Sequence, residues 1–216
     1  MTLRIFAKNE SSLPKIWFYK MKGTNLEVTL GEKYIADKLP KSKSTVFLES
    51  RGYLREALSN LFEIEPLEIP IQANPGKPPK LPLGMGYLSI SHTIDALVII
   101  WDINKVGIDM ERMDRNFNYK SLAKNVFKKK IDEKYYNNRK KDILKRWCSL
   151  EAAIKWERGS IFRDIYNWDY FDNNKKIIHK TKNYKVNVFQ INFYDWIIAF
   201  CSERKILNSS IVCSEF

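Results

Sequence analysis

Alternating hydrophobic and polar positions predict several short strands along the chain. The alternation occurs in the first thirty residues, in the stretches "LRIFAK", "IWFYK" and "LEVTL". It returns within residues 86–110 in "GYLSIS", "ALVIIWD" and "KVGIDM", where short breaks around Asp95 and Asn104 favour antiparallel hairpins. The later stretch "YKVNVFQINFYDWIIAFCS" predicts two more strands. Strand material is therefore expected in both halves of the chain.

Two other segments have the spacing of amphipathic helices. Residues 44–61 place apolar side chains at helical intervals and carry Arg51 and Arg55 on one face. A second helix is predicted from about Asp142, and Gly159 is a plausible end for it. Its buried stripe consists of Ile143, Trp147, Leu150 and Ile154. Between the two helices, the proline-rich residues 75–84 predict a constrained, ordered loop.

Composition adds a strong positive charge to this picture. The 216 residues include 44% hydrophobic side chains, enough for an ordinary core, and 37 Lys or Arg against 25 Asp or Glu. Residues 120–146 alone hold 11 Lys or Arg and three acidic residues. The expected partner is therefore anionic: a nucleic acid, a membrane surface, an acidic protein or a phosphate-bearing ligand.

The cysteines and the apolar runs indicate the compartment. Cys148, Cys201 and Cys213 are odd in number and lack a C-x-x-C spacing, which favours reduced, structural cysteines over disulfides or a zinc site. The longest apolar run, residues 96–101, is too short to span a bilayer, and no targeting segment is recognisable. A cytoplasmic protein is expected.

Two pairs of charged residues are candidates for chemistry. Asp109 and Glu111 are two apart on a predicted strand, so both side chains leave the same face of the sheet. Two carboxylates held together repel unless a cation intervenes, and an oxygen-only site suits Mg²⁺. On the second helix, Glu151 and Lys155 lie one turn apart. Taken singly, an exposed carboxylate pair and a surface ion pair are the simpler interpretations.

A third candidate is His92, one of two histidines in the chain. It follows Ser91 and precedes Thr93 at a predicted strand end, where it could donate a hydrogen bond to a phosphate. A histidine with a satisfied structural hydrogen bond is the more common outcome for such a residue.

Four motifs occur in a defined order: "GKP" (76–78), "SISHT" (89–93), "VGIDME" (106–111) and "WCSLEAAIK" (147–155). In this combination the chain resembles the 4′-phosphopantetheinyl transferases of the larger, two-lobed type. The resemblance is carried by residues 76–155 and is weaker before residue 50 and after about residue 165.

The resemblance implies an α+β fold of two similar lobes related by a pseudo-twofold. Each lobe would pack a small antiparallel sheet on a long helix, with the site in the cleft between the lobes. Residues 1–103 would form the coenzyme A-binding lobe, and residues 104–216 would form the lobe that carries the metal site and the catalytic helix. A monomer is expected.

The implied reaction moves the phosphopantetheine arm of coenzyme A onto a serine hydroxyl of an apo carrier protein and releases 3′,5′-ADP. By resemblance, Asp109, Glu111 and Glu151 would hold Mg²⁺, for which Mn²⁺ could substitute. Glu151 would also take the serine proton, and Lys155 would stabilise charge on the departing group.

The resemblance also implies which residues bind coenzyme A. Ser91, His92 and Lys77 would contact its phosphates together with Lys155, while Gly76 would allow close approach of the backbone. Arg51 or Arg55 would bind the 3′-phosphate, and the sequence does not distinguish them. Weaker candidates for phosphate contact are Lys41 and Lys43.

One departure from the family pattern is Leu150, which stands where these enzymes usually have Lys before the helix glutamate. The basic segment 120–146 is interpreted either as a docking surface for an acidic carrier protein of fatty-acid, polyketide or peptide synthesis, or as a solvated helical face. Two alternatives to the transferase stay open. One is a degenerate relative that binds coenzyme A or carriers without catalysis, and the other is a basic nucleic-acid-binding module.

Overall fold

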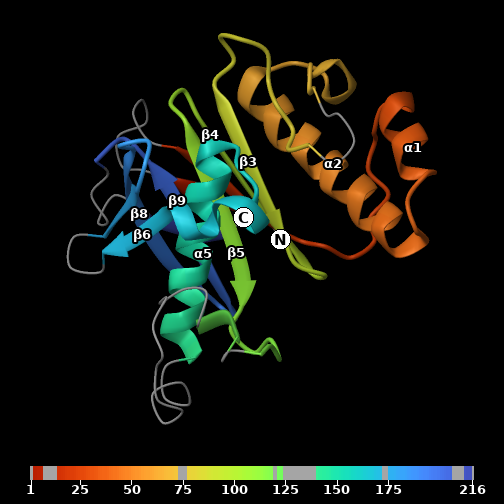
Figure 1. Cartoon of the computed structure of the whole chain (residues 1–216). Coiled ribbons are helices and arrows are strands. Elements are labelled where there is room, and N and C mark those ends of the chain that lie inside the picture. The colour runs from red at the N-terminus through yellow and green to blue at the C-terminus, as the bar shows by residue number, and fades with distance from the viewer. Residues whose placement is uncertain are drawn as a thin grey trace.

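The computed structural model describes residues 2–6, 14–72, 77–118, 121–123, 140–171, 175–205 and 212–215, of which the first and last ranges are described as backbone. The fold is α+β, with two five-stranded antiparallel sheets and two long helices. The strand orders are β10-β1-β2-β4-β3 in the first sheet and β5-β9-β8-β7-β6 in the second. Figure 1 shows α2 beside β3 of the first sheet and α5 beside β5 of the second.

The first sheet consists of β1 (Thr2–Phe6), β2 (Lys15–Lys20), β3 (Tyr87–His92), β4 (Ala96–Asp102) and β10 (Val212–Glu215). The second consists of β5 (Val106–Arg112), β6 (Trp168–Phe171), β7 (Lys176–His179), β8 (Lys185–Phe193) and β9 (Trp196–Ser202). The helices are α1 (Leu30–Ala36), α2 (Lys41–Phe62), α5 (Lys140–Glu157) and α6 (Ile161–Asp164), with the short 3₁₀ turns η1 (Pro66–Glu68) and η2 (Ile165–Asn167). The last strand of the chain pairs with the first, since β10 lies antiparallel to β1.

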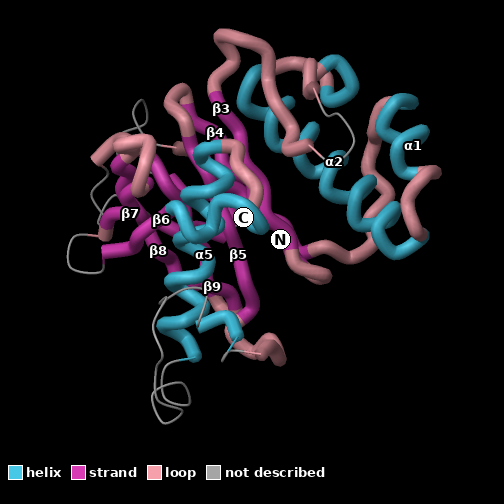
Figure 2. Tube along the Cα trace, in the orientation of Figure 1, coloured by secondary structure: helices cyan, strands magenta, loops and turns pink. Residues whose placement is uncertain are grey.

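The two sheets share one core and each carries a long helix on its other face (Figure 2). Strand β4 shows how: Val98 and Ile100 pack between the sheets, whereas Leu97 and Ile99 face α2. Strand β9 does the same for the second sheet and α5. Both strands are buried on both faces, which explains their uninterrupted apolar sequences.

Most of the predicted elements are confirmed, and one predicted strand is wrong. The predicted helices correspond to α2 and α5, and β3, β4, β5, β8 and β9 occur where alternation indicated them. The stretch "LEVTL" is not a strand. Its Thr29 caps α1, because the Thr29 hydroxyl accepts from the Glu32 N–H while the Glu32 carboxylate accepts from the Thr29 N–H.

The hairpin predicted at Asn104 is also wrong. Strand β5 leaves the first sheet and pairs with β9 along its whole length. Both edges of β4 are already paired, with β2 on one side and β3 on the other, so β5 has no place beside it. The Asp102 carboxylate turns the chain at this point by accepting hydrogen bonds from the backbone and side chain of Asn104.

Strands β3 and β5 are the facing edges of the two sheets, and side chains join them. The Ser89 hydroxyl accepts a hydrogen bond from the Ile108 N–H at 3.2 Å. The Ser91 hydroxyl donates to the Asp109 carboxylate at 2.7 Å. The serines of "SISHT" therefore connect the first sheet to the strand that carries the acidic pair.

Three further expectations concern the rest of the chain. Cys148 and Cys201 are buried and unpaired. Within the described ranges, each helix is too short or too polar to cross a bilayer. Most of the basic segment, namely residues 120 and 124–139, lies outside the described residues, as does Gly76.

Candidate active site

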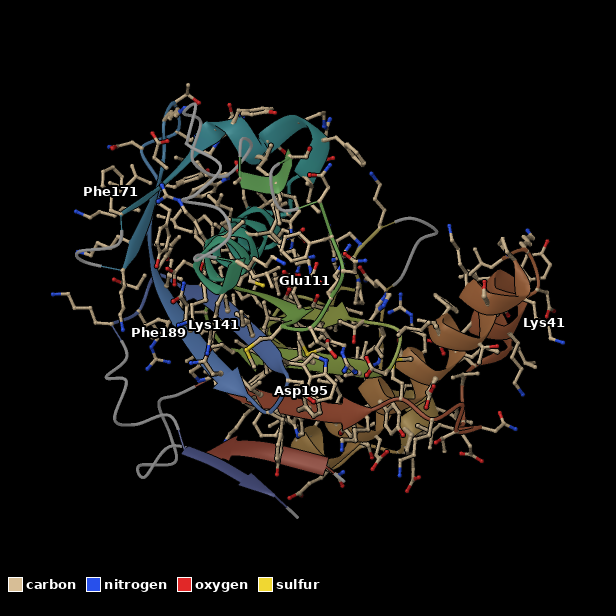
Figure 3. All side chains as sticks on the ribbon, turned by 90° about the horizontal axis from the view of Figure 1, so that it is seen from below. Lys41, Glu111, Lys141, Phe171, Phe189 and Asp195 are labelled. Carbon is tan, nitrogen blue, oxygen red and sulfur yellow. The ribbon has the colours of Figure 1, made fainter. Side chains whose placement is uncertain are left out.

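A cavity of about 860 Å³ lies where α2, β3, β5 and α5 meet. Segments far apart in the sequence contribute charged and polar side chains to its lining: Arg51, Lys77, Ser91, His92, Asp109, Glu111, Glu151 and Lys155. Glu111 lies centrally in the molecule in the side-chain view (Figure 3). The same view places Lys41 at the outer end of α2, away from Glu111, whereas Lys43 lines the cavity. The structure therefore brings all but two of the described candidates together, the exceptions being Arg55 and Lys41.

Gly107 determines how closely β5 approaches α5. A Cβ atom at this position would lie 2.1 Å from the carbonyl oxygen of Ala152 and 2.3 Å from the backbone nitrogen of Trp156. Because side chains alternate along a strand, Asp109 and Glu111 share the face of Gly107 and also point toward α5. The glycine thereby brings the carboxylates of the strand within reach of Glu151 and Lys155. Its position inside a strand pattern was a sequence signal for close backbone approach.

Asp109 is the most firmly held carboxylate of the cavity. It is buried, and its Oδ1 accepts hydrogen bonds from the Ser91 hydroxyl and the Lys155 ammonium, each at 2.7 Å. Its Oδ2 is buried and has no hydrogen-bond partner among the described residues. A buried carboxylate oxygen without a hydrogen-bond partner costs free energy. A cation, or a hydrogen-bond donor of a ligand, would therefore bind favourably to this oxygen.

Glu111 pairs with Arg115, a residue that was not among those predicted from the sequence. Its Oε1 accepts a hydrogen bond from the guanidinium of Arg115, which follows the end of β5. Burial raises the pKa of Glu111 despite this contact, and the Asp109 carboxylate adds to the increase. Arg115 gave no signal in the sequence, because its four-residue spacing from Glu111 indicates a contact only within a helix.

Glu151 is the carboxyl group whose acidity is changed most. Burial, followed by the neighbouring charge of Asp109, raises its pKa to about 8, with a further contribution from Glu111. The Lys155 ammonium acts in the opposite direction. Three carboxyl groups thus influence one another within one cavity, which is the electrostatic setting in which a divalent cation is stabilising.

The described residues fit a divalent cation by chemistry more than by their present arrangement. Three carboxylates are the oxygen donors that Mg²⁺ and Mn²⁺ accept, and Asp109 offers a free buried oxygen. Among the described residues, however, no group of three or more His, Cys, Asp or Glu side chains is arranged to hold a metal. Lys155 and Arg115 are paired with two of the three carboxylates.

The two arginines of α2 have different surroundings. Arg55 is buried away from the cavity, in an ion pair with Glu32 at 2.8 Å and in hydrogen bonds to the carbonyl oxygens of Pro66 and Ile69. Arg51 lines the cavity and is also buried, but its Nη1 has no hydrogen-bond partner among the described residues. Burial lowers the pKa of Arg51. Of the two, Arg51 is the one placed to bind an anion.

At the rim of the cavity, His92 and Lys77 are exposed. Desolvation, followed by the nearby Lys155 ammonium, lowers the pKa of His92 below its ordinary value, which favours the neutral imidazole with one N–H donor. The Ser91 hydroxyl is already committed to Asp109, which makes Ser91 a positioning group for that carboxylate in this structure.

Leu150 faces the core of the second sheet. Only 1% of the residue is exposed, and it belongs to the apolar cluster that α5 forms with β8 and β9. The sequence departure at this position is therefore accommodated by packing, and the cavity lining does not include it.

Comparisons with known proteins add no family to this description. No protein-family model matches the chain, and no curated protein matches its sequence significantly.

Proposed function

We propose that the protein is a 4′-phosphopantetheinyl transferase, which moves the phosphopantetheine arm of coenzyme A onto a serine of an apo carrier protein. One observation carries the proposal: a single cavity combines buried and exposed cations with three mutually interacting carboxylates. The cations suit the phosphates of coenzyme A, and the carboxylates suit a divalent ion at its diphosphate. The order of the four sequence motifs independently supports the same reaction.

We assign each side chain a role that suits its position in the cavity. Arg51 would bind the 3′-phosphate, because its guanidinium is buried with a nitrogen that has no described partner. Lys77 and His92 would contact phosphates from the rim. Asp109, Glu111 and Glu151 would hold Mg²⁺ or Mn²⁺, which when bound neutralises and orients the diphosphate.

In the transfer step, the serine oxygen forms a bond to the phosphorus that carries pantetheine, while the bond from that phosphorus to the oxygen of 3′,5′-ADP breaks. Glu151 would take the serine proton, and Lys155 would stabilise the charge on the departing group. Since burial and Asp109 raise the pKa of Glu151 to about 8, the base role requires added positive charge in the cavity.

The arrangement of the sheets and helices supports our proposal that the chain forms two similar lobes. Each sheet packs against one long helix, α2 or α5, and the cavity lies where elements of both sheets meet. We assign residues 1–103 to the coenzyme A-binding lobe and residues 104–216 to the lobe of the metal site, related by a pseudo-twofold. The β10 strand would then cross from the second lobe to the sheet of the first. We further propose that the protein acts as a cytoplasmic monomer on acidic carriers.

The test is incubation with coenzyme A, Mg²⁺ and a panel of apo carrier proteins, followed by intact-mass measurement of each carrier. A mass gain equal to one phosphopantetheine on at least one carrier is expected. The Glu151→Gln and Asp109→Asn variants should abolish the gain while their circular dichroism spectra stay unchanged. If folded protein binds coenzyme A but modifies no carrier, the degenerate, non-catalytic alternative is correct. Salt-sensitive binding to DNA or RNA without transfer would instead support a nucleic-acid-binding module.

A further inference from the structure

Arg115 lies next to the three carboxyl groups of Asp109, Glu111 and Glu151, which together form the carboxylate cluster. Its guanidinium bonds Glu111, whose side chain is only 13% exposed, whereas the Arg115 side chain is 53% exposed. Arg115 also lines a second cavity of about 280 Å³ together with Glu111 and Glu151. The partly exposed guanidinium could therefore leave its carboxylate without disturbing the core.

The cluster is largely neutralised from within. Lys155 bonds Asp109 and Arg115 bonds Glu111, so two internal cations face three carboxyl groups. The hydrogen bond to Glu111 raises the pKa of Arg115, and the charges of Glu151 and Asp109 contribute in the same direction. Arg115 thus interacts with all three carboxyl groups.

A divalent cation has to compete with these internal cations. Arg115 occupies Oε1 of Glu111, so Glu111 can give both of its oxygens to a metal only after that hydrogen bond is broken, and the guanidinium repels the ion while it stays nearby. Asp109 has an unpartnered second oxygen, Oδ2, and can bind without losing Lys155. The obstacle to metal binding is therefore concentrated at Glu111 and Arg115.

We propose that Arg115 is a built-in counter-ion that opposes metal binding at Glu111 until an anionic ligand takes up its positive charge. The inference rests on the proposed function for the identity of that ligand, a diphosphate. Arg115 is in this account a positioning residue, since it acts through Glu111.

Thermodynamic linkage gives this arrangement a consequence. A diphosphate that draws Arg115 or Lys155 away from the carboxylates raises the affinity of the carboxylates for the metal. The bound metal then raises the affinity of the protein for the diphosphate by the same factor. Metal and diphosphate then bind together, and the free protein holds the metal weakly.

The test is a calorimetric titration of the full chain with Mn²⁺ alone, without coenzyme A. The variants are Arg115→Gln, which removes the charge, and Arg115→Lys, which keeps it. The matched control is Arg112→Gln, because Arg112 is a nearby arginine whose guanidinium pairs with Asp95 and Asp114 instead of the cluster. Binding at the cluster is defined as the heat that Asp109→Asn abolishes.

Arg115→Gln is expected to bind Mn²⁺ about tenfold more tightly than the unmodified protein, the effect of removing one partly exposed competing charge. Arg115→Lys and Arg112→Gln should stay within about twofold of the unmodified protein. A second titration is made with coenzyme A present. Coenzyme A should raise the Mn²⁺ affinity of Arg115→Gln by a smaller factor than it raises that of the unmodified protein.

Three results would overturn the inference: an unchanged or weaker Mn²⁺ affinity in Arg115→Gln, an equal gain in Arg112→Gln, or Mn²⁺ binding that Asp109→Asn does not affect. These results differ from a failure of the proposed function. In that case carriers stay unmodified in the mass assay, while Arg115→Gln still tightens Mn²⁺ binding.

Discussion

Substituting Gly107 by Ala tests whether the contact between β5 and α5 builds the site. The added Cβ would lie 2.1 Å from the Ala152 carbonyl oxygen and 2.3 Å from the Trp156 nitrogen, well inside van der Waals contact. Both of the atoms that the new Cβ would overlap belong to the backbone of α5. The overlap can therefore be relieved only if the whole of α5 moves relative to β5. Overpacking of this kind costs about 3 kcal/mol, at the upper end of the usual range. The free energy of unfolding in urea measures it.

The same shift would separate Glu151 and Lys155 from Asp109, so loss of cluster-specific Mn²⁺ binding should accompany the loss of stability. The matched control is Gly31→Ala in α1, where an added Cβ would meet no atom of the described residues outside the neighbouring helix backbone closer than the Thr29 hydroxyl oxygen, at 4.0 Å. That variant should be unchanged or stabilised by less than about 1 kcal/mol. A Gly107→Ala variant with unchanged stability and Mn²⁺ affinity would show that the close contact between β5 and α5 does not build the site.

Four further substitutions separate binding from structural roles. Arg51→Met should weaken coenzyme A binding in calorimetry by at least about tenfold, with stability nearly unchanged. Arg55→Met should instead lower the free energy of unfolding by about 3 kcal/mol, because it leaves Glu32 unpaired. Leu150→Lys should cost more than about 3 kcal/mol in urea unfolding, since it buries an amine in the core; a stable variant would show that Leu150 does not face the core. Burial acts to raise the pKa of Glu32, but Arg55 and Thr29 together hold it below the ordinary value of 4.5. The pair therefore stabilises the fold above pH 4.5 and loses that effect as the pH falls through the lowered pKa. Glu32→Gln should accordingly be less stable at pH 7 by about 3 kcal/mol, and the difference should shrink below pH 4.5 as the pH falls through the lowered pKa of Glu32. A difference that is independent of pH would contradict this.

The periodic elements could be predicted from the sequence because their patterns are local. Strand alternation placed Asp109 and Glu111 on one face, and helical spacing placed Leu150 in the core. The partner of β5 could not be predicted in this way. A turn at Asn104 reads as a hairpin locally, but the choice of sheet depends on β2 already occupying the other edge of β4. Such non-local competition leaves no mark within a short window of sequence.

The site was predictable in its members but not in its contacts. Arg51 and Arg55 have the same helical face and the same residue type, and only the position of Glu32 on α1 determines which of them is consumed by an ion pair. Arg115 was missed because its contact with Glu111 depends on the turn that follows β5. The direction of Ser91 toward Asp109 likewise depends on the meeting of two sheets.

We propose above that the carboxylate cavity serves the transfer of a phosphopantetheine group. The decisive measurement counts the 3′,5′-ADP released and the carrier modified in one reaction with Mg²⁺. One 3′,5′-ADP is expected for each carrier modified, with neither product formed by Glu151→Gln or in the absence of a divalent cation. Release of 3′,5′-ADP without modified carrier, or the same yields from Glu151→Gln, would contradict this proposal.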